Sequence, residues 1–179
     1  PLQTPRRRPR RAPGRPRLKS NEAFERLRAP LLDGTLRAGE FVSQQDLVVR
    51  MRMPMAPVRE AVKRAASDGL VEVLPQRGVR VMEATPQRIL DGFGLRLLVD
   101  REGARKHARR GLAPGLGELK RAHEAVLAEC RRNLTDIAIA RSYEVDWALH
   151  AALAGAIDNA LVADLYERNR ERLTILQRT

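Results

Sequence analysis

The sequence predicts a mostly α-helical protein, in which three helices and a β-hairpin are followed by an all-α helical bundle. Two observations predict this architecture. Apolar residues recur at three- and four-residue spacing along most of the chain, and the spacing changes to two only over residues 70–82. Hydrophobic residues make up 43 % of the 179 residues, enough to form a core. We expect a disordered arm over 1–20, one domain over 21–82 and a helical domain over 83–179.

Residues 1–20 combine five prolines with eight basic side chains and no acidic one. Proline interrupts helices and strands, and the segment buries nothing, so we expect disorder. It carries most of the net charge of +12, which is typical of a protein that binds a polyanion. The segment is a solvated tail, a tether that binds DNA without sequence preference, or a transit peptide.

The first predicted helix covers residues 21–32. Four apolar side chains recur along one face of it: Phe24, Leu27, Leu31 and Leu32. Pro30 should kink or split this helix, because proline lacks the N–H group of the helical hydrogen bond and collides with the preceding turn. Asp33 and Gly34 then provide a stop signal.

Two further helices follow, with a short turn between them. Ser43 can cap a helix over 43–51, with Asp46 three residues on as a weak form of the capping box. The next helix runs over 55–68, where Pro57 lies in the first turn and loses no hydrogen bond. This spacing is typical of a helix-turn-helix motif.

A β-hairpin is predicted next, because β-rich runs over 70–74 and 78–82 flank a proline-containing turn over 75–77. Three helices and a hairpin make a winged helix. Beyond Thr85, which can cap a helix with Pro86 at its first position, the pattern is helical throughout. Four helices are predicted there: 86–110, 115–131, 135–155 and 159–178.

Composition narrows the classes of function. Aromatic residues make up only 3 %, too few to stack unpaired bases, so duplex DNA is a better partner than single strands or RNA. The single cysteine, Cys130, excludes an intrachain disulfide, and no apolar run reaches the roughly 20 residues that cross a bilayer. We expect a soluble, cytoplasmic protein that contacts no membrane. No nucleophile, base and orienting group converge in a recognisable spacing, which argues against an enzyme.

Several short motifs lie in one order and at close spacing. They cover residues 32–40, 43–47, 56–62, 68–71 and 76–79, followed by Arg96, Leu98 and Asp100, the run 146–150 and the pair 158–159. These motifs resemble the GntR family of bacterial regulators, and the later ones resemble its FadR-like subgroup, over residues 21–179. The resemblance implies a winged helix-turn-helix domain that binds duplex DNA, followed by an FCD-type helical domain that binds an effector. It also implies a homodimer that reads a palindromic operator.

The third helix would lay its N-terminal side chains in the major groove. Arg59 is the best candidate for a base contact, because arginine donates two hydrogen bonds to guanine; the alternative is a surface arginine. Lys63 and Arg64 are either phosphate contacts or solvated charges. In the wing, Arg77 can reach the minor groove and Gly78 lets the backbone approach it, unless the glycine serves only a tight turn.

The sequence departs from the GntR pattern at the expected DNA surface. Pro54, Met55 and Ala56 replace a polar N-cap, an arginine and a threonine, and Gln45 stands where the family often has an arginine. Ser43, at the start of the same helix as Gln45, is another expected contact. Either the operator differs, with Met55 touching a thymine methyl group, or binding is weak and the arginine-rich arm compensates.

In the helical domain, Asp146 and His150 are four residues apart and share one helix face. Such a pair is either two ligands of a divalent metal or an ordinary surface or core pair. The resemblance implies a metal such as Zn²⁺ on both, completed by two histidines from later helices. Arg96 is a candidate partner for an effector carboxylate, or else forms an ion pair with Asp100 one turn away. We expect Arg96, Asp146 and His150 to bind the effector, a small organic acid.

The chain has fewer helices than the resemblance implies. The FadR-like sensing domain has six or seven helices, whereas about four are predicted here, so we expect one wall of its cavity to be missing. The chain would then be a fragment or a natural short form. His107 and His123 lie on helices that do not match the metal-binding ones, and are expected to be exposed.

The favoured function is a ligand-responsive transcription regulator, more often a repressor, whose effector changes the spacing or mobility of two DNA-reading heads. A non-specific architectural DNA-binding protein, held on DNA by its arm, is the first alternative. A metal-dependent enzyme is the second, and only Asp146 and His150 support it.

Overall fold

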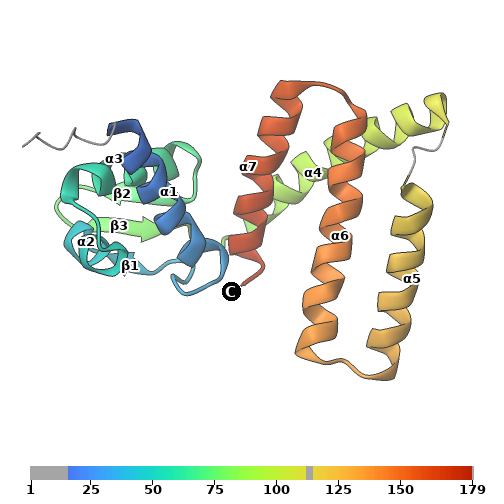
Figure 1. The fold of residues 1–179 in the computed structure, drawn as a ribbon, viewed down its shortest axis with the longest axis horizontal. Helices are drawn as coiled ribbons and strands as arrows, with labels where there is room; N and C mark the ends of the chain where they lie inside the picture. The colour runs from blue at the N-terminus through green and yellow to red at the C-terminus, as the bar shows by residue number, and fades with distance from the viewer. Residues whose placement is uncertain (1–15, 112–114, 179) are drawn as a thin grey trace, which may run out of the picture. The chain divides into compact units, whose positions relative to one another are not determined.

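A computed structural model describes residues 16–111 and 115–178 (Figure 1). These residues form two compact units. The first comprises the described residues up to Glu83 together with Arg178, and the second, called the helical unit below, comprises Ala84–Gln177. The first unit combines helices with a small sheet, and the described residues of the helical unit form helices only. The predicted fold class is confirmed. None of the described helices is sufficiently long and apolar to cross a membrane.

The first unit contains a three-stranded antiparallel sheet next to its helices. The helices are α1 (Pro16–Leu32), α2 (Gln44–Met51) and α3 (Met55–Ser67), and the strands are β1 (Phe41–Val42), β2 (Val71–Leu74) and β3 (Gly78–Val81). Strands β2 and β3 form the predicted hairpin. Strand β1 is not predicted by the sequence; it pairs with the other side of β3, so that Val42 lies opposite Val79. Two residues are too few to show an alternating pattern.

Helix α1 begins at Pro16 and not at Asn21. Residues 16–20, predicted as part of the disordered arm, are therefore helical, while the rest of that arm lies outside the described residues. Proline fits the first turn of a helix, because the N–H group it lacks would have no partner there. Pro30 does not split α1: it lies in the last turn, and the helix ends at Leu32.

The core of the first unit lies between its helices and one face of the sheet. Its fully buried large side chains are Leu27 and Leu31 of α1, Leu47 of α2, Val58 and Val62 of α3, Leu70 and Val81. Burying one such side chain stabilises the fold by roughly 1.5–3 kcal/mol. Because Val58 and Val62 hold one face of α3 in the core, the opposite face is left to solvent.

The helical unit consists of α4 (Pro86–Arg110), α5 (Leu116–Arg132), α6 (Asp136–Ala156) and α7 (Ala160–Leu176). These bounds agree within two residues with the predicted helices. Three side chains cap them by accepting backbone N–H hydrogen bonds: Thr85 from Arg88 at 3.3 Å, Thr135 from Ala138 at 3.1 Å, and Asn159 from Leu161 at 2.9 Å. Helix α4 packs against α6 and α7, and α6 also packs against α5.

Candidate nucleic-acid interface and a charged cluster

Helices α2 and α3 are joined by the turn 52–54, which gives the predicted helix-turn-helix spacing (Figure 1). The Ser43 hydroxyl caps α2, because it accepts a hydrogen bond from the Asp46 N–H group at 3.0 Å and donates one to the Asp46 carboxylate at 2.7 Å. Helix α3 follows Pro54, which provides no side-chain cap. The first turn of α3 thus presents Met55, half-buried, and Ala56, exposed.

Arg59 lies on the solvent face of α3, in its second turn, and is exposed. None of the described acidic side chains pairs with its guanidinium group. Lys63 lies one turn further along the same face and forms an ion pair with Glu60, with 2.9 Å between Nζ and Oε1. Exposed pairs of this kind contribute little to stability, so Lys63 can exchange Glu60 for another anion at small cost. The exposed side chain of Gln45 lies near the start of α2.

Arg64 is exposed as well, but its side chain is engaged by neighbours within the first unit. Its guanidinium group lies 3.8 Å from the centre of the Phe24 ring on α1, and its Nε atom lies 4.0 Å from the Asp68 carboxylate. This stacking joins α3 to α1 and places the charge beside the core. Phosphate contact and solvated charge both stay predictions for Arg64, because its side chain is 53 % exposed although it stacks on Phe24.

The wing carries Arg77 at its tip, exposed and with no acidic partner in the described part of the chain. Its backbone N–H group donates to the Leu74 carbonyl at 3.1 Å, which closes a tight turn with Gln76 at φ +60°. Gly78 has φ +99°, and a Cβ atom there would lie 2.7 Å from the Val42 carbonyl oxygen. The approach of β1 therefore accounts for this glycine without any contact to DNA.

One residue of the helix-turn-helix region escaped the sequence analysis. Arg52, the first residue of the turn, has φ +50° and ψ +45°, in the left-handed region that favours glycine. The sequence held one signal for it. Helices commonly end with a left-handed residue that caps their final carbonyls, and no glycine follows Met51 to take that position.

The second group of predicted residues meets in the helical unit, between α4 and α6. Arg96 donates hydrogen bonds to both carboxylate oxygens of Asp146, at 3.2 and 3.0 Å, and its Nε atom lies 3.8 Å from Asp100. His150 contacts the Arg96 guanidinium group, and its Nδ1 atom lies 2.9 Å from Asp100. The Arg96 side chain is 12 % exposed and that of Asp146 is 42 % exposed. The structure thus brings Arg96, Asp146 and His150 together, and adds Asp100.

This arrangement limits what the cluster can bind. Arg96 pairs with Asp146 and lies near Asp100, so the ion-pair interpretation of Arg96 has a structural basis. Among the described residues, one oxygen of Asp100 is buried without a hydrogen-bond partner, and the contact of His150 Nδ1 with the other oxygen is an ion-pair contact that lacks hydrogen-bond geometry. Within residues 16–111 and 115–178, no group of three or more His, Cys, Asp or Glu side chains is placed to hold a metal ion. A metal on Asp146 and His150 stays a prediction.

Tyr166 of α7 is a buried neighbour of this cluster that the sequence analysis did not single out. Its side chain is 3 % exposed, and its hydroxyl group has no hydrogen-bond partner among the described residues. Burial raises the pKa of the phenol to about 12, with opposing effects from Arg170 and Glu167. The phenol is therefore neutral at any physiological pH and adds no charge beside Arg96.

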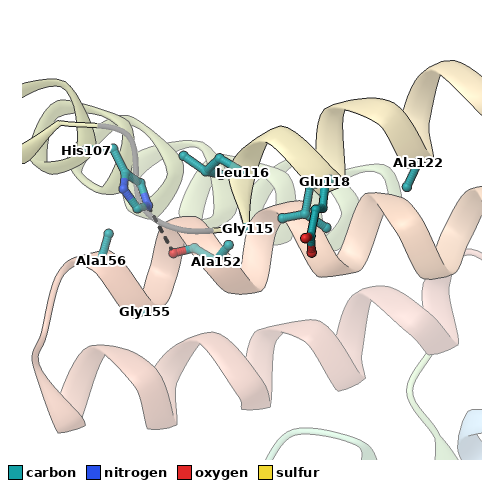
Figure 2. A pocket seen from close by; sticks show the side chains of 9 residues that line it. His107, Gly115, Leu116, Glu118, Ala122, Ala152, Gly155 and Ala156 are labelled. Atoms are coloured by element: carbon teal, nitrogen blue, oxygen red, sulfur yellow. Dashed lines mark hydrogen bonds between the residues drawn. The ribbon is translucent and has the colours of Figure 1, made fainter.

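A separate cavity of about 630 Å³ opens between α4, α5 and α6 (Figure 2). Its lining is mostly small and apolar: His107, Gly115, Leu116, Glu118, Leu119, Ala122, Ala152, Gly155 and Ala156. His107 and His123, predicted to be exposed, are half-buried instead. Their rings lie against the protein because each ring nitrogen contacts a backbone carbonyl. His107 Nε2 lies 3.4 Å from the Ala152 oxygen of α6, and His123 Nδ1 lies 2.8 Å from the Leu119 oxygen one turn earlier on α5.

Comparison with known proteins places the first unit in a family. Residues 19–81 match the sequence model of bacterial regulatory proteins of the gntR family. The chain is 26 % identical over 149 residues to the HTH-type transcriptional repressor RspR of Escherichia coli K12. This match covers 83 % of this chain and 63 % of RspR. The HTH-type transcriptional regulator BphR of Paraburkholderia xenovorans is 31 % identical over 88 residues, or 49 % of this chain and 36 % of BphR.

Solved structures show the same architecture over a longer stretch. A GntR transcriptional regulator from Rhodococcus sp. RHA1 superposes with a TM-score of 0.66 at 25 % identity, over 89 % of this chain and 73 % of that one. McbR/YncC of E. coli, at 20 % identity and a TM-score of 0.59, shares the fold over 88 % of this chain and 72 % of its own. The family and these relatives are regulators and not enzymes, as predicted. The first unit therefore contains a winged helix-turn-helix domain of the gntR family of bacterial regulatory proteins.

Proposed function

We propose that the protein regulates transcription by binding duplex DNA through α3 and the wing. One observation carries the proposal: Arg59 lies exposed and without a described acidic partner on the solvent face of α3. In helix-turn-helix proteins this face of the second helix enters the major groove. The Arg59 fork can donate two hydrogen bonds to one guanine, and Arg77 at the tip of the wing can reach the adjacent backbone or minor groove.

The operator that we propose differs from one read by polar side chains at the start of α3. Met55 and Ala56 can contact only apolar groups, such as a thymine methyl group, because neither side chain donates or accepts a strong hydrogen bond. Gln45 on α2 can donate to a phosphate or a base edge. Sequence preference would then depend chiefly on Arg59, with each good contact worth about 1–3 kcal/mol of discrimination.

A homodimer and a cytoplasmic location belong to the same proposal. Duplex DNA offers identical half-sites one turn apart, roughly 34–36 Å, to a protein with two-fold symmetry. Two copies of α3 would read a palindrome, and binding over a promoter would repress transcription. Because the chain spans 63 % of the length of RspR, these properties of the whole protein are proposed by similarity and by duplex geometry.

The effector that we propose is a small organic acid that binds at Arg96. Planar guanidinium groups suit carboxylates, and Arg96 already binds one in Asp146. An effector would have to replace that carboxylate, which is 42 % exposed and so can move into solvent. A divalent metal on Asp146 and His150 would need ligands beyond the described ones, and no step of the proposal depends on it.

The test is selection of binding sites from a pool of random duplexes at physiological salt. Four proteins are compared: the full chain, a variant lacking residues 1–15, Arg59→Ala, and Arg131→Ala. The truncation stops at residue 15 because α1 begins at Pro16. Arg131→Ala removes the same charge from an exposed position on α5 and is the matched control.

An enriched palindrome that survives the truncation and the control, and disappears with Arg59→Ala, supports the proposal. Retention of DNA without any enriched sequence, lost on truncation, would refute it and identify a non-specific architectural DNA-binding protein held by its arginine-rich arm. The repressor assignment is tested separately with a reporter gene behind the enriched site, whose expression should fall when the protein is present.

A further inference from the structure

The end of α2 is closed by two backbone hydrogen bonds that require a left-handed residue. The Arg52 N–H group donates to the Val49 carbonyl and the Met53 N–H group donates to the Val48 carbonyl, both at 3.2 Å. This pair of bonds is the Schellman motif, in which the residue after the helix adopts φ near +60°. Arg52 occupies that position, with φ +50°.

The motif needs nothing from the Arg52 side chain. The Met51 carbonyl at the same helix end accepts a further hydrogen bond, at 2.7 Å, from the Arg26 guanidinium group of α1. Met53, the next residue, is 8 % exposed and anchors the turn in the core. A glycine at 52 would satisfy the same backbone without the crowding of its Cβ atom. An arginine here costs stability, and its exposed side chain is not part of the core.

The charge of Arg52 is also unused within the part of the chain that the structure describes. Its side chain is exposed, and none of the described acidic residues pairs with it. Neighbouring cations are engaged: Arg50 lies 3.6 Å from Glu40, and Arg64 stacks on Phe24. Strained residues that survive without a structural reason are found mainly at functional sites.

We infer that Arg52 binds a DNA phosphate at the edge of the groove that α3 enters. The turn comes directly before the N-terminus of α3, and the sugar-phosphate backbone borders the groove at that end. The three residues after Met53, Pro54–Ala56, provide no polar side chain. The phosphate contact of Arg52 would supply part of the DNA affinity that polar side chains at 54–56 would otherwise provide. This inference rests on the proposed DNA binding.

Three substitutions separate the backbone conformation from the charge. Arg52→Gly and Arg52→Asn both suit the left-handed conformation and remove the charge, whereas Arg52→Lys keeps the charge. Arg131→Ala again controls for net charge. Thermal unfolding is measured for each full-length variant, together with affinity for one fixed duplex over a series of salt concentrations.

We expect Arg52→Gly to raise the Tm by roughly 2–6 °C, because the strain is relieved. Both uncharged variants should bind about 5–10-fold more weakly, and the slope of log affinity against log salt should fall by about one. Arg52→Lys and Arg131→Ala should retain the slope of the unsubstituted protein. The loss should be the same for every duplex sequence, because phosphates carry no sequence information.

Several results would overturn the inference. Unchanged affinity and salt slope in both uncharged variants, with Arg59→Ala still abolishing selection, would refute the phosphate contact alone and leave the proposed function standing. Weaker binding by Arg52→Gly but not by Arg52→Asn would assign the effect to flexibility. A lower Tm in Arg52→Gly would show that the arginine stabilises the turn. No binding of any duplex by the unsubstituted protein would refute both proposals.

Discussion

Helix α4 provides a matched pair of glycines that tests how closely α4 and α6 approach. Gly103 is buried, and a Cβ atom on it would collide with the backbone of Leu153 on α6. Gly94, on the same helix, has nothing within 4 Å of the equivalent position. Alanine improves the helix propensity of both sites by about 1 kcal/mol, so only the contact with α6 differs between the two substitutions.

For Gly103→Ala, the atoms in the way belong to backbone and cannot rotate aside, so α4 and α6 must separate. Overpacking of this kind costs typically 1–3 kcal/mol, and the upper part of that range applies to a backbone contact. After the propensity gain, we expect a net loss of about 1–2 kcal/mol, or a fall in Tm of roughly 4–12 °C. Gly94→Ala should instead raise the Tm by a few degrees.

The assay is thermal unfolding followed by circular dichroism, with urea unfolding as a second measurement of the free energy. Equal shifts for Gly103→Ala and Gly94→Ala would refute the reasoning, because they would mean that α6 does not lie against Gly103. A rise in Tm with Gly103→Ala would contradict the α4–α6 packing that also brings Arg96 to Asp146.

Other substitutions test single features. Arg96→Met leaves Asp146 and Asp100 without their shared cation, so the free energy of unfolding should fall by roughly 2–3 kcal/mol in urea titrations, and an unchanged value would contradict the buried pairing. Gln76→Asn should raise stability by about 0.5–1 kcal/mol, because asparagine tolerates φ +60° better than glutamine; a loss would argue against the tight turn. The pKa of Tyr166 is raised by burial from 10 to about 12, so the folded state favours the neutral phenol. That contribution is complete below pH 10 and is lost as pH rises through about 12, so Tyr166→Phe should flatten the stability profile measured between pH 10 and 12.

Interactions between residues close in sequence are the ones that the sequence predicted. Ser43 caps α2 through a residue three positions later, and Thr85 with Pro86 begins α4, because a helix terminus is decided by the few side chains beside it. The buried face of α3 follows from the same local rule, since Val58 and Val62 are one helical turn apart. That is also why Arg59 could be placed on the solvent face from the sequence.

Contacts between distant residues were not predictable in the same way. Strand β1 exists because Phe41 and Val42 meet β3, not because of any pattern of their own. Arg64 is an exposed cation as the sequence suggests, but its stacking on Phe24 of another helix could not be predicted. Arg96 and Asp146 are 50 residues apart, and their pairing depends on how α4 crosses α6. Helix periodicity gives the face of each side chain but not the partner that the other helix brings to it.

The pairing of Arg96 bears directly on which effector could act at that cluster. Asp146 is 42 % exposed while Asp100 is 17 % exposed, so Asp146 is the carboxylate that an incoming acid would displace. The exchange removes one hydrogen-bonded pair and forms another, so a single carboxylate gains little net free energy from Arg96. An effector must therefore supply further contacts, through a second acidic group or an apolar body, before it binds tightly. It would also break a link between α4 and α6, and a ligand shifts a conformational equilibrium only through such a difference in affinity.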